Sequence, residues 1–376
     1  MRDMTDEKKK TVPEREEEVL KFWEERKIFE KSLARNRKGK TFVFYEGPPT
    51  ANGMPGIHHV EARAFKDIIP RYKTMQGFFV PRKAGWDTHG LPVEIQVEKE
   101  LGLKNKQDIE RYGIGAFNQK AKESVWRYKE EWEKLTKRMG FWVDLTDPYI
   151  TYETPYIESL WWIIKEFWKK GLLEQDFKIL PWCVRCQTGL SSHEVGQGYK
   201  KTSDTAVYVK FKLKAGQKIG DFTTNDKTYI LAWTTTPWTL PGNVGLAVGN
   251  KIEYQIAQKN DEFLITAQDA QVRIPWDGPV NFLEKKLKGE NLIGVKYQSL
   301  FLIPEFKKSE TAYKIYPADF VSAEDGTGVV HTAVMYGEDD YVLGKKVGLP
   351  TVHTVDETGH FIKSLGDRLG GLPIVS

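Results

Sequence analysis

The order of a strand, a loop rich in glycine and proline, and a helix between residues 41 and 73 limits the possible folds most. Residues 41–45 are β-branched or aromatic without clean alternation, which is typical of a strand buried on both faces of a parallel sheet. Turn-forming residues dominate 47–53, and apolar residues at helical spacing follow from Val60 to Tyr72. A doubly wound α/β domain begins in this order, so we expect a parallel sheet flanked by helices.

The sequence pattern changes along the 376 residues and indicates three regions. The first 40 residues are charged and helical in pattern, with a helix start at Pro13. Residues 106–172 are also mostly helical in pattern, whereas alternating strands separated by Gly, Asn and Asp turns follow after about residue 195. We therefore expect a helical segment at 1–40, an α/β domain at 41–195 and a β-rich domain at 196–376.

Charge and cysteine content exclude several classes of protein. The 56 basic residues exceed the 52 acidic residues by four, which is too small an excess to indicate nucleic-acid binding by itself. Two cysteines exclude a disulfide scaffold. The charged start lacks the apolar part of a secretory signal, and no stretch approaches the roughly 20 apolar residues that a bilayer span needs. We therefore expect a cytoplasmic protein without a membrane-spanning segment.

Two loops near the first strand each place histidine beside glycine. One ends in Gly56-Ile57-His58-His59, and the other contains His89 between Thr88 and Gly90. Both follow presumed strands of one parallel sheet, and ligands bind at the carboxyl ends of such strands. A helix that begins near His58 would direct free backbone N–H groups at an anion such as a phosphate. Surface histidines at a helix start would give the same pattern, and neither common nucleotide-binding fingerprint occurs.

Three segments together resemble the isoleucyl-tRNA synthetase family, which belongs to the class I aminoacyl-tRNA synthetases. The segments are residues 47–53 (GPPTANG), 66–73 (KDIIPRYK) and 85–94 (GWDTHGLPVE). The last segment is specific, because the valine and leucine enzymes carry different residues there. The sequences of several segments are most similar to those of the eukaryote-like (type 2) bacterial branch. The resemblance covers the chain from Pro13 onward.

The resemblance implies which residues bind ATP and stabilise the reacting α-phosphate. The family signature at the helix start is His-x-Gly-His, but this sequence has Gly56 in place of the first histidine and His58 in place of the glycine. His59 keeps its place and can stabilise the charge that develops on the phosphate. The implied catalytic residues are His59, His58 and Gly56, and the implied ATP- and adenylate-binding residues are Gly47, Pro49, Asn52, Gly53, Gly56 and His59.

The exchanged histidine and glycine lead to a hypothesis about the adenylate pocket. Glycine normally allows close backbone approach to the nucleotide, so an imidazole at His58 must point elsewhere or the loop must shift. We hypothesise that the exchange keeps adenylation but weakens inhibitors that mimic the adenylate, such as the pseudomonic acid type. Neutral drift is the alternative.

The resemblance also implies an isoleucine site in the same two loops. Asp87 is suited to meet the substrate ammonium by a charge-assisted hydrogen bond. An aspartate that only caps the loop would fit the same position, and Trp86 could equally belong to the core. The implied amino-acid-binding residues are Pro48, Asp87, Trp86 and His89.

Cys183 and Cys186 form a Cys-x-x-Cys pair, which is half of a four-ligand zinc site. His193 is a weak third candidate, and a redox role would need a thioredoxin-like βαβ setting that the pattern does not indicate. In the family this pair belongs to a zinc knuckle whose second pair follows the inserted domain. The resemblance therefore implies Zn²⁺ in the intact protein and a partial site in this chain.

Two blocks in the β-rich region resemble the editing domain that is inserted into the isoleucine, valine and leucine enzymes. They are residues 233–243 and 326–341, although threonines in the first block could be plain strand residues. Editing is needed because a missing methylene discriminates by only about 1–3 kcal/mol, the established range for isoleucine against valine in this family. The implied editing residues are Thr234, Thr235, Thr236, Thr239, Asn243, His331 and Asp340.

The resemblance assigns a role to each kind of editing residue. Asp340 would bind the substrate α-ammonium, and the threonines and Asn243 would position the ester and a water. His331 would limit the pocket size and help to hold the tRNA adenosine. Because no side chain in the two blocks makes a convincing covalent nucleophile, we expect hydrolysis by a positioned water, aided by the terminal ribose hydroxyls.

The resemblance as a whole implies an isoleucine–tRNA ligase that uses ATP with Mg²⁺, acts on tRNA(Ile), edits mischarged valine and is a cytoplasmic monomer. The family's second ATP signature, Lys-Met-Ser-Lys-Ser, does not occur in the sequence. We therefore expect the first half of a Rossmann-like catalytic domain with an inserted β-rich editing domain that is incomplete at its C-terminal end. We also expect a break in the chain at residues 374–376 and no aminoacylation by the chain alone.

Three other functions fit parts of the sequence. A valyl- or leucyl-tRNA synthetase is disfavoured by residues 85–94. A free-standing aminoacyl-tRNA deacylase would need no ATP loop, yet residues 44–94 match that loop. A zinc-ribbon module that binds nucleic acid is disfavoured by the two cysteines and the net charge of +4.

Overall fold

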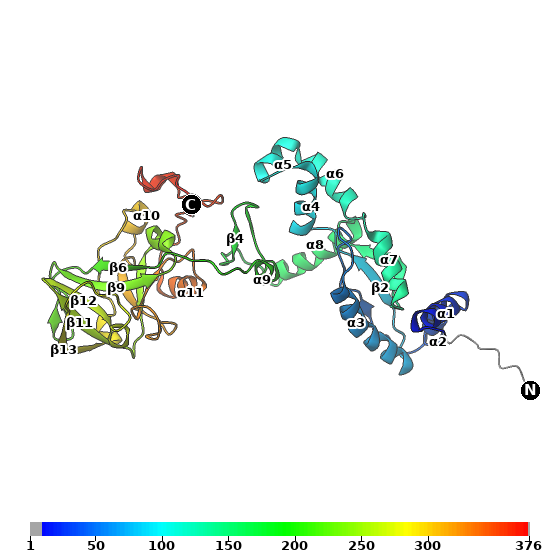
Figure 1. Cartoon of the computed structure of the whole chain (residues 1–376), viewed down its shortest axis with the longest axis horizontal. Helices are drawn as coiled ribbons and strands as arrows, with labels where there is room; N and C mark the ends of the chain where they lie inside the picture. The colour runs from blue at the N-terminus through cyan, green and yellow to red at the C-terminus, as the bar shows by residue number, and fades with distance from the viewer. Residues whose placement is uncertain (1–9, 375–376) are drawn as a thin grey trace, which may run out of the picture. The chain divides into compact units, whose positions relative to one another are not determined.

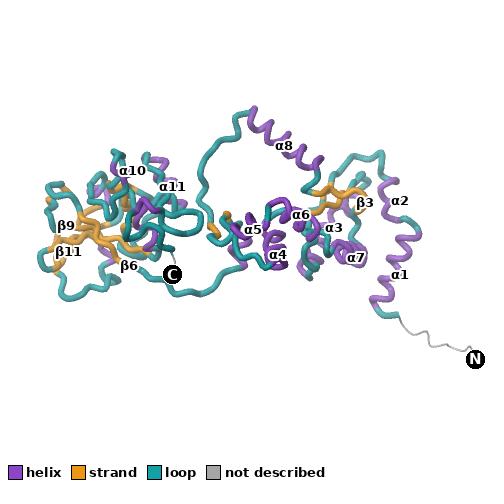
Figure 2. Tube along the Cα trace, turned by 90° about the horizontal axis from the view of Figure 1, so that it is seen from above, coloured by secondary structure: helices purple, strands orange, loops and turns teal. Residues whose placement is uncertain are grey.

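The computed structural model of the protein describes residues 10–374. Residues 1–9 of the expected helical segment, and the last two residues of the expected break, lie outside this range. The chain forms two compact units, Met1–Gln175 and Asp176–Ser376. Helices dominate the first unit and strands gather in the second, as Figure 2 shows. Within the described residues, no helix is both long and apolar enough to cross a bilayer.

The first unit contains a short sheet and most of the helices. Its elements are α1 (Val12–Glu25), α2 (Ile28–Arg35), β1 (Phe44–Tyr45), α3 (Ile57–Met75), β2 (Arg82–Trp86), α4 (Leu91–Leu101), α5 (Lys106–Tyr112), α6 (Ile114–Ser124), α7 (Lys129–Arg138), β3 (Asp144–Ile150) and α8 (Thr154–Lys169).

The second unit contains most of the strands and several 3-10 helices, labelled η. Its elements are β4 (Trp182–Cys183), β5 (Thr188–Gly189), α9 (Ser192–Gln197), β6 (Val207–Lys212), β7 (Lys218–Ile219), β8 (Phe222–Thr223), β9 (Thr228–Thr234), η1 (Pro237–Gly242), β10 (Gly245–Val248), β11 (Glu253–Lys259), β12 (Glu262–Ala267), η2 (Gln268–Ala270), β13 (Asn281–Lys288), η3 (Gly289–Leu292), α10 (Pro304–Lys307), β14 (Lys314–Pro317), β15 (Val329–Thr332), α11 (Glu338–Val347) and η4 (Lys363–Leu365).

The sheet of the first unit is parallel, as the sequence predicts. Its strands lie in the order β1-β2-β3, and both neighbouring pairs are parallel. The expectation of a strand at 41–45 buried on both faces is wrong, because only Phe44–Tyr45 form β1 and Tyr45 is exposed. The central strand β2 is the one buried along most of its length. Helices α3 and α7 run alongside this sheet in Figure 1. The buried Arg63 of α3 donates to Thr136 Oγ1 of α7 at 2.7 Å, which ties the two helices together.

Strand β3 lies inside residues 106–172, which the pattern predicts to be mostly helical. The helical expectation is wrong for this segment. Within the described sheet β3 pairs with β2 and with no other strand, so it lies at an edge. An edge strand tolerates a proline such as Pro148, because one side of the strand makes no ladder hydrogen bonds. Pairing with β2 over a long sequence separation, and not a local pattern, therefore stabilises this strand.

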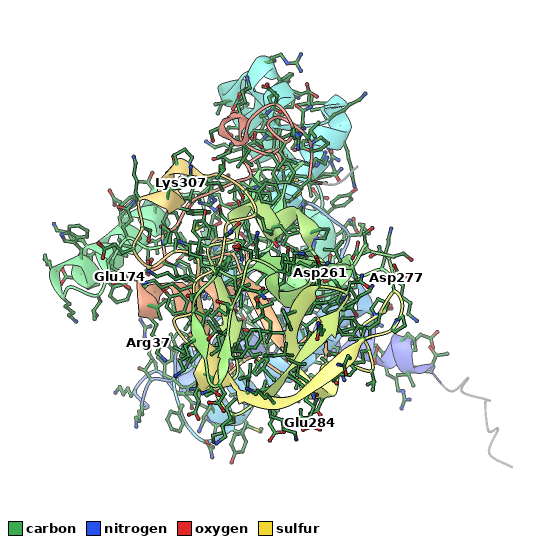
Figure 3. The ribbon with its side chains drawn as sticks, turned by 90° about the vertical axis from the view of Figure 1, so that its left-hand side faces the viewer. Arg37, Glu174, Asp261, Asp277, Glu284 and Lys307 are labelled. Atoms are coloured by element: carbon green, nitrogen blue, oxygen red, sulfur yellow. The ribbon has the colours of Figure 1, made fainter. Side chains whose placement is uncertain are left out.

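The β-rich character of the second unit is also confirmed. Five strands form one sheet in the order β13-β11-β12-β9-β6, and β14-β10-β15 form another. The strands expected at 206–211 and 228–233 correspond to β6 and β9. Asp261, in the turn between β11 and β12, and Glu284, on β13, are exposed, as Figure 3 shows.

The two sheets of the second unit share a large apolar core. Its fully buried members include Phe211, Ile230, Leu246, Tyr254 and Ile256. The hairpin of β4 and β5 and the helix α9 are also grouped with this unit. The functional boundary at 195–196 stays a prediction.

Candidate functional site

The two loops that the sequence singles out in the first unit lie side by side. The Asp87 N–H donates to the Pro49 carbonyl at 2.9 Å, and Thr50 and Asp87 form an isolated parallel bridge. Asn52 Nδ2 donates to the Pro92 carbonyl at 3.2 Å. The loops meet because β1 and β2 are adjacent parallel strands whose carboxyl ends share one edge of the sheet. Residues predicted to bind the nucleotide and the amino acid therefore belong to one loop cluster.

His59 lies in the first turn of α3 and caps its start. Its Nδ1 accepts the Gly56 N–H at 2.9 Å, so the neutral ring carries its proton on Nε2. Burial lowers the pKa of His59, and the neighbouring His58 and Arg63 lower this pKa further. The neutral ring keeps one N–H donor beside the positive end of the helix dipole. This arrangement can donate a hydrogen bond to a phosphate oxygen.

His58 and Gly56 are coupled by their geometry. The rings of His58 and His59 lie 3.8 Å apart between centroids, and His58 is exposed. A Cβ atom placed on Gly56 would lie 2.9 Å from His58 Cε1, closer than real Cβ contacts. A side chain at position 56 therefore requires the His58 ring to move. The two exchanged positions of the signature depend on each other in this structure.

The predicted amino-acid-binding residues have different environments. The half-buried Asp87 accepts weak hydrogen bonds at 3.4 Å from Thr50 Oγ1 and from the His89 N–H, which leaves its carboxylate available to a stronger donor. Trp86 is 3% exposed and packs in a cluster with Ala51 and Trp132. Its placement is that of a core residue. Pro48 is half-buried and His89 is exposed.

A buried charge cluster that the sequence did not reveal supports the first loop. Glu46 immediately precedes Gly47 and forms an ion pair with Lys66 of α3. The Tyr149 hydroxyl donates to the Glu46 backbone carbonyl, and burial raises the pKa of Tyr149 to about 12. A Cβ on Gly85 would overlap the Tyr149 ring, so only glycine allows β3 to approach this closely. These contacts fix where the loop leaves β1.

A cavity of about 190 Å³ lies in the second unit between the two predicted editing blocks. Its lining residues are Trp233, Thr234, Thr236, Thr239, Val330, His331, Ala333, Tyr336 and Asp340. Five of the seven predicted editing residues are therefore together. Thr235 is exposed and Asn243 is buried, and neither lines the cavity. The volume is below the roughly 300–1,000 Å³ of drug-sized sites, so the cavity suits a small group.

Four elements bring the lining residues together. Strand β9 ends at Thr234, and the 3-10 helix η1 that follows carries Thr239. Strand β15 carries His331, and α11 carries Asp340 in its first turn. Gly328 has φ +72°, and a Cβ there would overlap Ala267. The glycine turn before β15 thus lets this strand lie beside the main sheet.

Asp340 carries a perturbed carboxyl group at one side of the cavity. Its Oδ2 accepts the Ala333 N–H at 3.2 Å. Burial raises the pKa of Asp340 to about 6, and the Ala333 hydrogen bond offsets part of this increase. A cation in the cavity would favour the ionised form. The site is therefore electrostatically suited to an ammonium group.

His331 is neutral in this environment. It is 8% exposed, and burial lowers its pKa to about 4. Its Nε2 lies 2.7 Å from Thr239 Oγ1, and its Nδ1 lies 3.3 Å from Asn243 Nδ2. Both ring nitrogens are thus engaged within the protein.

Comparison with known proteins assigns the family. The sequence profile described as "tRNA synthetases class I (I, L, M and V)" matches residues 18–342. The chain belongs to this family. It is 46% identical over 365 residues to the isoleucine–tRNA ligase of Clostridium tetani, covering 97% of this chain and 34% of that protein.

A second relative shows a similar identity and a similar partial coverage. The isoleucine–tRNA ligase of Thermus thermophilus is 49% identical over 351 residues, covering 93% of this class I tRNA synthetase chain and 33% of that protein. The chain spans about a third of the length of these curated relatives. Among solved structures, the ternary complex of an Agrobacterium radiobacter LeuRS with tRNA and LeuAMS is 16% identical with a TM-score of 0.34, covering 90% of this chain and 43% of that chain. A TM-score this low adds nothing to the assignment.

The cysteine pair of this class I tRNA synthetase lies in the β4–β5 hairpin. The Cys186 N–H donates to Cys183 Sγ at 3.4 Å. Within the described residues, however, no three His, Cys, Asp or Glu side chains are grouped so that they could hold a metal ion. His193 instead contacts Gln197 at 2.8 Å. The residues present therefore do not fit a complete four-ligand zinc site.

Sequence reasoning missed several residues of the cavity. Tyr336 follows the second block's strand, and its hydroxyl accepts the N–H groups of Thr354 and Val355 at 2.6 and 2.9 Å. Because Tyr336 lies between the predicted residues His331 and Asp340 in the second block, its position in the sequence could have indicated that it lines the cavity. Trp233 and Val330 adjoin predicted residues. Tyr297 does not line the cavity, but its hydroxyl donates to Asn243 Oδ1 at 2.7 Å, and it carried no sequence signal because it lies 54 residues from Asn243.

Proposed function

We propose that this chain forms part of an isoleucine–tRNA ligase, in which the loop cluster of the first unit binds isoleucine and ATP with Mg²⁺ to form isoleucyl-adenylate. The identity of 46–49% to isoleucine–tRNA ligases over most of the chain carries this proposal. The meeting of the loops at residues 47–53 and 85–94 supports it, because both substrates must reach the same point. The product would pass to tRNA(Ile).

Each residue of the loop cluster has a proposed part in adenylation. The Nε2–H of His59 donates to an oxygen of the α-phosphate, where negative charge increases in the transition state. Asp87 binds the isoleucine ammonium, and Pro48 packs against the amino acid. Gly47, Pro49, Asn52, Gly53 and Gly56 shape the backbone around the adenylate.

Pyrophosphate exchange on the protein encoded by the whole reading frame tests this proposal. We expect isoleucine-dependent exchange, and we expect His59→Ala to lower it by about 10²–10³-fold, as for loss of one oxyanion donor. His353→Ala, a histidine in the second unit, is the control and should leave exchange unchanged. Valine- or leucine-dependent exchange that exceeds the isoleucine rate would contradict the assignment.

We propose further that the cavity of the second unit hydrolyses valine from mischarged tRNA. The carboxylate of Asp340 would bind the α-ammonium of the valyl ester, and the hydroxyls of Thr234, Thr236 and Thr239 would position the ester and a water. The small cavity volume supports a substrate the size of a single amino acid. Hydrolysis would use the positioned water and the terminal ribose hydroxyl, without a covalent intermediate.

Deacylation of Val-tRNA(Ile) by the whole protein tests the editing proposal. Asp340→Ala should lower the rate by about 10²-fold or more, because the substrate ammonium loses its charged partner. Asp339→Ala is a matched control, because Asp339 is the exposed neighbour on α11. Deacylation that survives Asp340→Ala would show that another site binds the ammonium.

We propose that the protein is a cytoplasmic monomer and that its intact form binds Zn²⁺ through Cys183 and Cys186 together with ligands from outside the described residues. We also propose that residues 1–376 alone do not aminoacylate tRNA.

A further inference from the structure

A buried chain of hydrogen bonds leads from the editing cavity into the core of the second unit. Thr239 Oγ1 lies 2.7 Å from His331 Nε2, His331 Nδ1 lies 3.3 Å from Asn243 Nδ2, and Asn243 Oδ1 lies 2.7 Å from the Tyr297 hydroxyl. The exposed fractions fall from 8% at His331 to 4% at Asn243 and 1% at Tyr297. Only the first two members of this chain, Thr239 and His331, line the cavity among its described residues.

The direction of each hydrogen bond follows from the Asn243 amide. Its Nδ2 donates to the Gly245 carbonyl at 2.9 Å as well as to His331. Turning the amide over would place its oxygen against the Gly245 carbonyl oxygen, and two acceptors repel each other. Asn243 Oδ1 must then accept, so the Tyr297 hydroxyl is the donor. Both ends of the amide are therefore satisfied in a single orientation.

The amide orientation fixes the proton on the imidazole. Since His331 Nδ1 accepts from Asn243, the neutral ring carries its hydrogen on Nε2 and donates it to Thr239 Oγ1. The Thr239 hydroxyl hydrogen in turn donates to the Thr236 carbonyl at 2.8 Å. Neither nitrogen of His331 has a free lone pair that could take a proton from a water in the cavity.

We propose that Tyr297 and Asn243 are positioning residues that hold His331 in the tautomer protonated on Nε2, so that His331 orients the Thr239 hydroxyl and is not the general base of hydrolysis. The catalytic half of this inference rests on the editing function proposed above, whereas the tautomer does not. Asn243 thereby acts from behind the cavity, because its amide groups are already committed to protein partners.

The surroundings of Tyr297 support a fixed anchor. Its ring makes edge-to-face contacts with Phe211 and Tyr313 at centroid distances of 5.4 and 5.8 Å. Burial raises the pKa of Tyr297 well above its ordinary value and lowers the pKa of His331 to about 4, so both groups stay neutral near pH 7. The proposed hydrogen-bond directions require Tyr297 to be a neutral hydroxyl donor and His331 to be a neutral imidazole.

Nitrogen-15 NMR of the 376-residue chain with labelled histidine reads the tautomer directly. The signals of His331 are assigned by their loss in His331→Gln. We expect Nε2 to be the protonated nitrogen and Nδ1 the unprotonated one at pH 7. A wild-type His331 that is protonated on Nδ1, or that exchanges equally between both forms, would overturn the inference.

Two variants then separate positioning from general stability. In Asn243→Asp, the carboxylate can only accept, so we expect Nδ1 to become protonated and the pKa of His331 to rise. In Tyr297→Phe, Asn243 Oδ1 loses its donor, and we expect a population with the proton on Nδ1 to appear. Tyr254→Phe is the matched control, because that buried hydroxyl donates to the Gly328 carbonyl outside the chain of bonds. Tyr297→Phe spectra identical to those of Tyr254→Phe would remove Tyr297 from the mechanism.

Deacylation of Val-tRNA(Ile) by the same variants of the whole protein tests the catalytic half. We expect Tyr297→Phe to lower kcat by about 10- to 100-fold, the range for lost positioning, and Tyr254→Phe to lower it much less. A wild-type protein that shows the expected tautomer but never deacylates would overturn the editing function and leave the tautomer assignment intact. A Tyr297→Phe protein with altered tautomer and unchanged kcat would overturn the catalytic role alone.

Discussion

The buried carboxylate of Asp340 is expected to reduce the stability of the folded protein at neutral pH, a cost that fits its proposed role in binding an ammonium. The pKa of its carboxyl group is raised by burial to about 6, against a model-peptide value near 3.9. The folded state therefore holds a proton that the unfolded chain releases as the pH rises from about 4 to 6. Stability is lost over that window and stays lower at neutral pH.

Asp340→Asn is therefore expected to stabilise the protein at neutral pH. The gain should be about 1–3 kcal/mol at pH 7.5, since the pKa is raised by about two units and each unit corresponds to about 1.4 kcal/mol. It should shrink toward zero near pH 4, where both forms of the residue are uncharged. Urea unfolding at the two pH values measures this. Equal stabilisation at both pH values would show that the effect is not ionisation.

The Gly56–His58 pair gives a second prediction at the scale of single residues. In an enzyme encoded by the whole reading frame, Gly56→His/His58→Gly should bind adenylate-mimicking inhibitors more tightly than the natural sequence does. Removing the His58 ring clears the space that a Cβ at position 56 needs. Inhibition constants for the pseudomonic acid type measure the change. Gly56→His alone is the control and should not gain affinity, because the His58 ring remains. Equal affinity of the double variant and the natural sequence would support neutral drift.

Residue types in the sequence identified the cavity, but not the direction in which each side chain points. Thr234, Thr236, Thr239, His331 and Asp340 line the cavity as expected. Asn243 lies two positions before Gly245, whose carbonyl, with Tyr297, turns the amide away from the cavity. That orientation depends on a residue 54 positions away, which a motif cannot encode.

At the scale of helices and strands, the sequence predicts the elements whose formation depends only on a local residue pattern. Strands β6 and β9 alternate or run apolar over six or seven residues, and the sequence located both. Strand β3 contains Pro148 and few apolar residues, so it exists through its pairing with β2. The β4–β5 hairpin illustrates the same limit, because its strands are only two residues long and depend on the turn between Cys183 and Thr188.

That hairpin leads to a prediction about metal removal. Residues 1–376 are expected to unfold at the same temperature before and after dialysis against a chelator, because two thiols do not complete a zinc site. Burial raises the pKa of Cys186, which further disfavours the thiolate that zinc requires. Elemental analysis of the purified chain should find far less than one zinc per molecule. One equivalent of tightly held zinc would show that ligands complete the site in solution.

At the scale of the whole molecule, the two units differ in how much apolar surface they bury. The second unit has one large core cluster, whereas the clusters of the first unit contain three buried residues each. Helix α8 has no buried residue, and its Trp161, Trp162 and Trp168 are each more than 60% exposed. Exposed apolar surface of this kind normally marks an interface. The first unit therefore carries the loop cluster on a sheet and helices that remain partly uncovered.

A last prediction concerns what residues 1–376 can do alone. We expect no isoleucine-dependent pyrophosphate exchange from them, because the sequence has the first of the family's two ATP signatures only in the altered form Gly56-Ile57-His58-His59 and lacks the second. Catalysis needs the reacting groups to be held in place around the phosphate. Exchange of labelled pyrophosphate into ATP measures this, with the whole enzyme at equal concentration as the control. Robust exchange would mean that the three-stranded sheet and the His59 loop suffice for adenylation. It would also mean that the loop cluster is ordered although the apolar side chains of α8 remain exposed.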